Sequence, residues 1–479
     1  MKSTRRAARA SGFLASSLAI VSVCRFLRNV VLARMLLPED FGIGATFTLS
    51  LTFFELLTEL GPAKQLIQAR HGARAAWMGV AHLVLAARGV LIAAILFLAS
   101  GTIAGWFGVP DARSAFQFLA LAPLMRGFEH CDVCRFQRHL RFSQLAWVEA
   151  APAVLSLLLA PLAATVYPDY RAFLAVTLVW AFARLIVSHV VASRPYRLRY
   201  QPEVLRRFLS FGWPLLGNSL LLFLILHGER LLVATRFDLA TLGAYSVALG
   251  LGFAPTMMFA KLHSSVALPV FSRSRVDRAA FRRAVAGSSQ IVCLVAGLVA
   301  IAFVVAGSWL VGACYGKAYL VSQQVIPWIG LMCAMRVVRC TPSMMSIALG
   351  DTQIPLLSNI ARVTFFGVGA LFVSMGNDVA WVPASGFLGE LMAYLVSLML
   401  LRKRHHAPVG ESLGCLLRVA SVVAIVVGAK ASGVVSSVPD PALAAIGGVA
   451  LFGFAMLQWE TLRTAIQSVL FQRKGLPST

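Results

Sequence analysis

Charged residues are scarce in this chain, and acidic residues are the scarcest of them. Only 19 of the 479 residues are Asp or Glu, and charged residues of both signs together make up 13% of the sequence. A soluble globular domain carries about 25% charged residues, so the soluble class is excluded. Apolar residues recur in runs of about 20, the length that a helix needs to cross a bilayer. We therefore predict an all-α polytopic membrane protein, because a lipid-exposed backbone must satisfy its own hydrogen bonds.

Motifs for catalysis and cofactor binding are also absent from the sequence. It contains no P-loop, no GxSxG, no HExxH and no clustered Asp motif of the kind found in nucleotide-sugar enzymes. Among the eight cysteines, only Cys131 and Cys134 have CxxC spacing, and no second pair lies at zinc spacing. We therefore expect no enzyme activity, no metal and no bound cofactor, and leave open a proton or sodium gradient as the source of energy.

Positive charge, by contrast, is plentiful, and 43 Lys and Arg give a formal net charge of +24. No basic stripe with interleaved aromatic residues is present, so nucleic acid is not expected as a partner. Instead, the basic residues lie in short loops between apolar runs. With a cytoplasmic N-terminus, roughly 28 of them, Arg336 and Arg339 included, fall inside and about six outside. This asymmetry predicts about fourteen spans, with both termini cytoplasmic.

The longest polar stretch divides the sequence into parts. We predict an N-lobe at 1–192 with helices 1–6, a basic cytoplasmic connector at 193–207, a C-lobe at 208–404 with helices 7–12, and two extra C-terminal helices with a basic tail at 405–479.

A short internal repeat supports this division. Residues 28–42 read RNVVLARMLLPEDFG and residues 230–243 read RLLVATRFDLATLG. Each copy opens one half, at spans one and seven, which predicts parallel repeats related by an axis along the membrane normal. Chance resemblance between two apolar helix ends is the alternative.

Helix-breaking residues cluster at the start of the second half. Gly212 and Pro214 lie in span seven, and Pro255 lies in span eight. Proline removes a helical hydrogen bond and kinks the axis. Such kinks are ordinary in membrane helices, but we favour a bending pair that lets one half rock against the other.

Two pairs of charged residues fall inside the first two spans, where each charge costs about 2.5–3.5 kcal/mol. Arg25 and Arg28 share one face of the first span, and Glu55 and Glu59 share one face of the second. A tight Pro-Glu-Asp turn at 38–40 joins the spans. We expect this hairpin to form one wall of a polar cavity.

Four further arginines are embedded in apolar spans: Arg88, Arg184, Arg230 and Arg362. Ion pairs with embedded glutamates, stapling helices together, are one interpretation. We favour binding of an anionic head group, because guanidinium forks match phosphate oxygens and cannot be deprotonated. The excess of embedded Arg over Glu favours an anion over a cationic drug. For transport driven by a proton or sodium gradient, Glu55 and Glu59 are the candidate coupling sites.

Specific stretches of the sequence also resemble a known family. LARMLLPEDFGIGATFTL (32–49) followed by ELGPAKQLIQ (59–68) strongly resembles the start of the bacterial oligosaccharide flippases, the Wzx-like polysaccharide transporter family. Shorter pieces that agree with it are RFQRHLRF (135–142), LPVFSR (268–273), YGKAYL (315–320) and ALGDTQIP (348–355). The resemblance covers most of the chain.

The resemblance implies a fold shared with MATE-type multidrug exporters and the lipid II flippase: two six-helix lobes with two added C-terminal helices. It implies alternating access in the bacterial inner membrane, with an undecaprenyl-pyrophosphate oligosaccharide as substrate for surface polysaccharide assembly. Membrane lipids, a polysaccharide polymerase and a chain-length regulator are the implied partners, and Arg25 and Arg28 match embedded basic positions that bind an anion. The alternatives are a cation-coupled multidrug exporter, which would need an acidic cavity, and a membrane polymerase or ligase, which would need a large outside loop.

Overall fold

The structure, a computed structural model, describes residues 2–69, 71–139, 142–320, 324–376, 378–432 and 438–457. Helices dominate these residues, and no β-strand occurs among them, which confirms the predicted all-α class. Ten helices of the described part are long and apolar enough to cross a bilayer. The chain is therefore a multi-pass membrane protein, and the count of fourteen spans stays a prediction.

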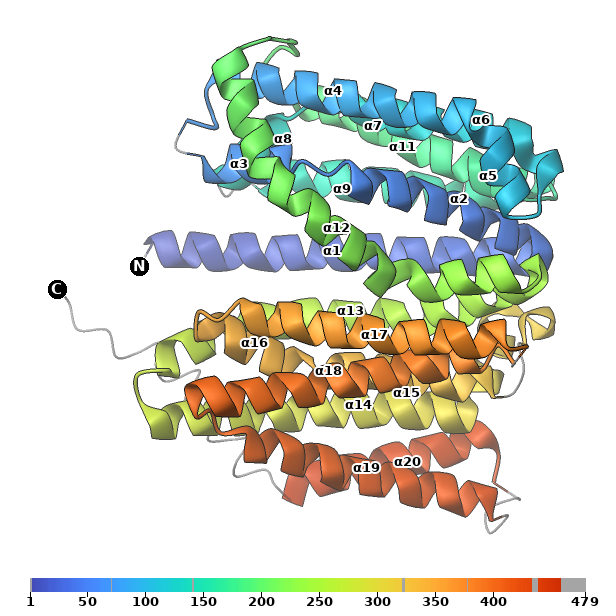
Figure 1. The fold of residues 1–479 in the computed structure, drawn as a ribbon, viewed down its shortest axis with the longest axis vertical. Helices are drawn as coiled ribbons and strands as arrows, with labels where there is room; N and C mark the ends of the chain where they lie inside the picture. Colours follow the sequence, from blue (N-terminus) through green and yellow to red (C-terminus); the bar gives the residue numbers. More distant parts are fainter. Residues whose placement is uncertain are drawn as a thin grey trace. The chain divides into compact units, whose positions relative to one another are not determined.

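The chain forms two compact units, Met1–Val247 (unit 1) and Ala248–Thr479 (unit 2), and the boundary falls within helix α13, Leu239–Ser274 (Figure 1). The lobes predicted from the basic connector stay a prediction. In unit 1, α12 crosses the long helices obliquely, whereas α1, α2 and α4 run roughly parallel or antiparallel (Figure 1). The helices of unit 1 before α13 are α1 (Lys2–Met35), α2 (Pro38–Leu57), α3 (Pro62–Gln68), α4 (Ala75–Leu98), α5 (Ser100–Trp106), η1 (Pro110–Ala112), α6 (Arg113–Leu119), α7 (Leu121–Gly127), α8 (Asp132–Arg138), α9 (Phe142–Leu158), α10 (Ala160–Val166), α11 (Arg171–Val191) and α12 (Pro202–Arg236).

The predicted hairpin of the first two spans is present, but its turn is shorter than expected. Only two residues separate α1 from α2, because Pro38 is the first residue of α2 instead of part of a free turn. Proline suits that position, since the first N–H of a helix has no intrahelical partner. At the other end α2 stops at Leu57. Glu59, expected within the span, therefore lies just beyond the helix.

Prolines explain where two of the apolar segments are interrupted. The apolar run at 115–131 contains most of α6 and all of α7, and α6 ends at Leu119, four residues before Pro123. In unit 2, α15 ends at Val338, four residues before Pro342. A proline cannot donate to the carbonyl four residues earlier, and its ring displaces that carbonyl. Each proline therefore divides an apolar segment into two shorter helices.

Unit 2 is built around α14, which packs against α15, α19 and α20. Small and β-branched residues such as Val292, Ala296 and Ala300 form the α14 side of its core.

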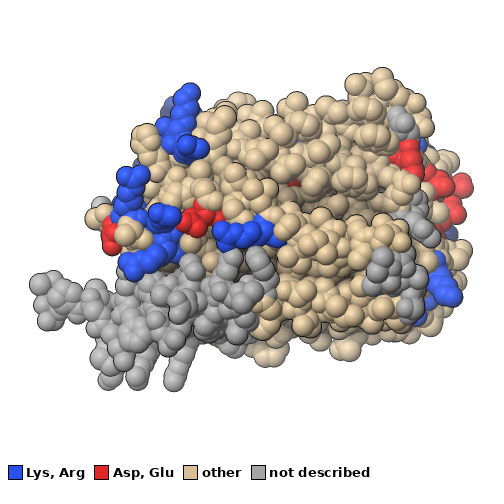
Figure 2. Space-filling model, turned by 90° about the horizontal axis from the view of Figure 1, so that it is seen from below, with Lys and Arg blue, Asp and Glu red and all other residues tan. Residues whose placement is uncertain are grey.

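Figure 2 shows a face that is mostly uncharged between ends that carry charged side chains, as expected for a surface that meets acyl chains. After α13, the helices are α14 (Arg278–Tyr315), η2 (Lys317–Tyr319), α15 (Val325–Val338), α16 (Cys340–Ala348), α17 (Gln353–Ser374), α18 (Trp381–His405), α19 (Val409–Ala431) and α20 (Asp440–Leu457).

Histidines hold the basic segment that follows α11 against the rest of unit 1. His82 contacts the carbonyl of Arg197 through Nδ1 at 3.1 Å, and the backbone N–H of Cys131 donates to its Nε2 at 3.0 Å. Nε2 is therefore an acceptor, and Nδ1 carries the proton. His130 reaches the carbonyl of Arg194 at 2.9 Å through Nε2. The segment is thus fixed by neutral imidazoles.

The residues predicted as hinges lie within unbroken helices. Gly212 and Pro214 lie in α12, and Pro255 lies in α13. A side chain at Gly212 would meet Leu60, with its Cβ 2.7 Å from the Leu60 carbonyl oxygen, so this glycine allows α12 to approach the end of the α2 segment closely. Bending at the three positions stays a prediction.

Candidate functional site

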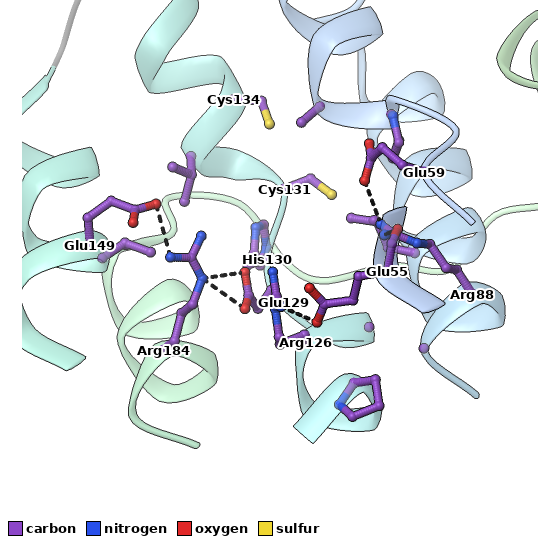
Figure 3. A pocket seen from close by; sticks show the side chains of 18 of the residues that line it. Glu55, Glu59, Arg88, Arg126, Glu129, His130, Cys131, Cys134, Glu149 and Arg184 are labelled. Carbon is purple, nitrogen blue, oxygen red and sulfur yellow. Dashed lines mark hydrogen bonds and ion pairs between the residues drawn. The ribbon is translucent and has the colours of Figure 1, made fainter. Parts of the chain in front are cut away.

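A cavity of about 290 Å³ in unit 1 is lined by charged side chains of both signs (Figure 3). We call it the ion-pair pocket. Helices α2, α4, α7, α9 and α11 and the turn before α8 all contribute to it. Its charged lining residues are Glu55, Glu59, Glu129, Glu149, Arg88, Arg126 and Arg184.

A close helix crossing brings two of these arginines together. A Cβ at Gly89 of α4 would lie 2.7 Å from the Cα of Gly127 in α7, and a Cβ at Gly127 would lie 2.8 Å from the Cα of Gly89. Only glycine allows two helices to approach this closely. The residues just before these glycines are Arg88 and Arg126. The crossing therefore places both guanidinium groups at the pocket.

The glutamates predicted as coupling sites are the partners of these two arginines. Nη1 of Arg88 pairs with Glu59 Oε2 at 2.9 Å, and its Nε donates to Thr58 Oγ1 at 3.0 Å. Arg126 forms an ion pair with Glu55. Glu55 and Glu59 thus line the pocket, whereas Arg25 and Arg28 of the first span are not among its lining residues. Each of the two glutamates already has a guanidinium partner (Figure 3).

Arg184, on the opposite wall, is shared between two carboxylates. Its Nε donates to both oxygens of Glu129 at 2.9 Å, and its Nη1 pairs with Glu149 at 2.9 Å. Cys131 and Cys134 also line the pocket, as free thiols. No group of three or more potential metal ligands occurs among the described residues.

Arg25 and Arg28 differ from these arginines because neither forms an ion pair with a carboxylate in the described part of the chain. Val21 and Cys24 of α1 pack against Ala153 of α9, and the two arginines continue this stripe at helical spacing. The Arg25 guanidinium lies over the ring of Trp180, 5.5 Å from its centroid. Arg28 donates to Asn29 at 3.3 Å, and its buried Nε has no hydrogen-bond acceptor.

Unit 2 contains a second charged cluster, around a fully buried carboxylate on α18. Glu390 accepts from Arg336 at 2.7 Å, from Arg339 at 2.6 Å and from Arg362 at 2.8 Å. The sequence predicts Arg336 and Arg339 among the inside-loop charges, but Arg336 lies in the last turn of α15, Arg339 directly follows that helix, and both are largely buried. Among the described residues one carboxylate thus faces three guanidinium groups.

The structure divides the six arginines predicted to bind substrate into different environments. Arg88, Arg184 and Arg362 form ion pairs, and Arg230 lies half-buried in α12 beside Glu229. Substrate binding by these four stays a prediction. The sequence analysis missed Arg126, Glu129, Glu149 and Trp180. Arg126 and Glu149 interrupt apolar segments, the same signal that identified Arg88, whereas nothing in the sequence distinguishes Trp180 from the other eight tryptophans.

Comparisons with known proteins match this chain to proteins of polysaccharide biosynthesis and transport. A family profile described as polysaccharide biosynthesis protein matches residues 31–324. The chain is 20% identical over 408 residues to the teichuronic acid biosynthesis protein TuaB of Bacillus subtilis (strain 168), which covers 79% of this chain and 81% of TuaB. It is 23% identical over 381 residues to the succinoglycan biosynthesis transport protein ExoT of Rhizobium meliloti (strain 1021), covering 78% and 73% of the two chains.

Solved structures share the fold. Lipid II flippase MurJ superposes with a TM-score of 0.72 at 10% identity, over 93% of this chain and 98% of MurJ. A multidrug resistance MATE family transporter in an inward-facing conformation gives a TM-score of 0.63 at 14% identity, over 84% and 95%. The predicted likeness to both fold relatives is therefore confirmed.

Proposed function

This chain is a member of the polysaccharide biosynthesis protein family, and from that membership we propose that it is a flippase for polyprenyl-pyrophosphate-linked oligosaccharides. Relatives are described as proteins of teichuronic acid biosynthesis and succinoglycan transport, and the fold is that of a lipid II flippase and of MATE transporters. These likenesses support a saccharide on a lipid carrier as cargo, moved across the bacterial inner membrane for surface polysaccharide assembly.

The observation that carries the proposal is the unpaired state of Arg25 and Arg28. A guanidinium inside an apolar helix is costly, and proteins normally pair it with a carboxylate or use it at a functional site. Unit 1 pairs Arg88, Arg126 and Arg184 with glutamates, but Arg25 and Arg28 of α1 form no ion pair with a carboxylate among the described residues. A pyrophosphate would supply the missing negative charge and acceptors that fit the guanidinium fork.

In the proposed cycle, Arg25 and Arg28 receive the pyrophosphate head group from the cytoplasmic side while the polyprenyl tail stays in the bilayer. Rocking of the two halves then exposes the head group on the outer side. This cycle assumes the orientation predicted from the loop charges, with both termini in the cytoplasm. A polysaccharide polymerase and a chain-length regulator are proposed to act on the delivered unit.

We propose further that a proton or sodium gradient drives the cycle and that Glu55 and Glu59 take part. The two carboxylates belong to the ion-pair pocket and bind Arg126 and Arg88. Neutralising either carboxylate would leave one guanidinium in the helix bundle without its ion-pair partner. An unpaired buried charge is costly, so the electrostatic energy of the pocket would change strongly. Glu55→Gln should therefore weaken the dependence of transport on the gradient more than it weakens substrate binding, as measured in vesicles with an imposed pH or sodium gradient.

Replacement of Arg28 tests the proposed function in cells. In a deletion strain complemented with Arg28→Ala, we expect loss of surface polysaccharide and accumulation of lipid-linked repeat units, with normal amounts of the protein in the membrane. Arg28→Lys should restore part of the polymer, because it keeps the charge but loses the planar fork.

Arg282→Ala is the matched control, since Arg282 belongs to unit 2, is 67% exposed and pairs with Glu411. It should leave polymer unchanged. Normal polymer with Arg28→Ala, or sensitivity to cationic drugs as the only defect of the deletion strain, would contradict the proposal.

A further inference from the structure

Trp180 of α11 lies among three guanidinium groups that come from three helices. Its ring centroid is 5.5 Å from the Cζ of Arg25 on α1, 5.6 Å from that of Arg126 on α7, and 5.5 Å from that of Arg184 on α11. Cations within about 6 Å of an indole face are attracted by its quadrupole, and tryptophan gives the strongest such contact. One ring thus connects the ion-pair pocket to the arginine on α1.

The ring has a different importance for each of the three arginines. Arg126 is held by Glu55, and Arg184 is held by Glu129 and Glu149, so their guanidinium groups would keep their positions without the indole. Arg25 forms no ion pair among the described residues, and its guanidinium contacts the ring. Glu149, the carboxylate whose charge acts on Arg25, is already bound to Arg184 at 2.9 Å. The indole face is therefore what fixes the orientation of Arg25.

The indole of Trp180 also carries a hydrogen-bond donor, Nε1–H, that no described residue uses. The Trp180 Nε1–H is buried and has no hydrogen-bond acceptor among the described residues. A buried indole N–H normally finds a partner. Within an apolar helix bundle an unmatched donor beside an unpaired guanidinium is best explained by an acceptor that a ligand supplies.

We propose that Trp180 is a positioning residue for a phosphate-type oxyanion: its ring holds Arg25 ready for the anion, and its N–H provides a hydrogen bond when the ligand is bound. This inference rests on the proposed function, because it assigns a second residue to the same head-group site. The inference adds to the head-group site an aromatic side chain whose environment changes when the anion binds. The bound anion would change both the charge above the indole and the hydrogen bond at Nε1.

Titration of the full-length protein in detergent with inorganic pyrophosphate tests this role. Trp180→Leu removes the ring and its N–H and should weaken binding roughly tenfold, the combined scale of one cation–π contact and one hydrogen bond. Trp180→Phe keeps an aromatic face, so it should bind more tightly than Trp180→Leu and less tightly than the wild type. Trp147→Leu is the matched control, since Trp147 is 65% exposed on α9; its affinity should equal that of the wild type.

Indole fluorescence provides a readout that a purely structural role would not change. Pyrophosphate should alter the emission of the wild type and of Trp147→Leu, and this change should be absent in Trp180→Phe. Equal affinity of wild type and Trp180→Leu, or an unchanged fluorescence response in Trp180→Phe, would overturn the inference. If Arg28→Ala loses pyrophosphate binding while Trp180→Leu keeps it, only the role of Trp180 is refuted. If Arg28→Ala keeps pyrophosphate binding, the head-group site itself is refuted. Unfolding temperatures of all variants, compared first, identify those that fold.

Discussion

At the scale of single residues, the embedded arginines differ in what a ligand would have to displace. Arg362 lies 2.8 Å from Glu390, and Arg184 lies 2.9 Å from Glu129. A phosphate could bind either of them only by competing with a carboxylate already in place. Arg25 and Arg28 have no such competitor among the described residues, so a phosphate gains charge-assisted hydrogen bonds worth about 1.5–3 kcal/mol each. This difference favours Arg25 and Arg28 as the receptor for the pyrophosphate.

The sequence predicted some of the embedded charged residues, but not Arg126, Glu129 or Glu149, and not how any of them pair. Arg88 and Glu59 were recognised because each interrupts or borders an apolar run. Their pairing depends on the crossing of α4 and α7 at Gly89 and Gly127, which no local pattern records. Trp180 had no signal at all, because an aromatic residue in an apolar helix is ordinary.

Acid sensitivity is expected at Asp132, which lies outside the membrane-spanning helices. Burial raises the pKa of Asp132, but hydrogen bonds from Arg135 and from the backbone N–H of Ser193 outweigh that effect and leave its pKa below the ordinary value. The folded state therefore binds fewer protons than the unfolded chain. Its stabilisation is present above the unfolded pKa of about 3.9 and is lost as pH falls towards the folded value.

Asp132→Asn should thus lower the free energy of unfolding by about 1–3 kcal/mol at pH 7. The difference in this free energy between variant and wild type should become smaller as pH falls from about 4 to the acid limit of the assay, about pH 2–3. Thermal unfolding in detergent measures both. Asp111→Asn, an exposed residue of η1, is the control. A difference that stays constant with pH would show that Asp132 contributes packing and not charge.

At the scale of helices, the two copies of the internal repeat meet at their last residues. A Cβ at Gly42 would overlap the carbonyl oxygen of Leu239, the first residue of α13, and a Cβ at Gly243 would overlap that of Pro38, the first residue of α2. Each repeat therefore ends on a glycine that packs against the start of the other helix. The sequence showed the repeat, but similarity between two segments does not say that they touch.

Alanine at either glycine should force α2 and α13 apart. Because a methyl group would meet backbone atoms, which cannot rotate away, we expect Gly42→Ala and Gly243→Ala to lower stability by about 1–3 kcal/mol or more. Unfolding temperature in detergent is the measurement. Gly250→Ala in α13 is the control, since nothing lies within 4 Å of its added Cβ; helix propensity should make it neutral or stabilising. Equal effects at all three positions would rule out the close contact.

At the scale of the whole molecule, hydropathy and family resemblance predicted the class and the fold. Apolar runs of bilayer length require helices, and the stretch around PEDFG identified the family that the match over 31–324 supports. Helix ends were less predictable. The apolar run of span seven covers only 209–227, whereas α12, which contains it, extends over Pro202–Arg236, because a helix continues into polar residues wherever packing supports it.

The account as a whole depends on recognition of a pyrophosphate by two arginines of one helix. Its most direct test is the rate at which a polyprenyl-pyrophosphate oligosaccharide crosses the bilayer of proteoliposomes that contain the purified protein. We expect the wild type and Arg282→Ala to accelerate the crossing equally, and Arg25→Ala and Arg28→Ala each to slow it roughly 10- to 100-fold, the effect of losing charge-assisted hydrogen bonds. Crossing at the wild-type rate in both α1 variants would contradict the account.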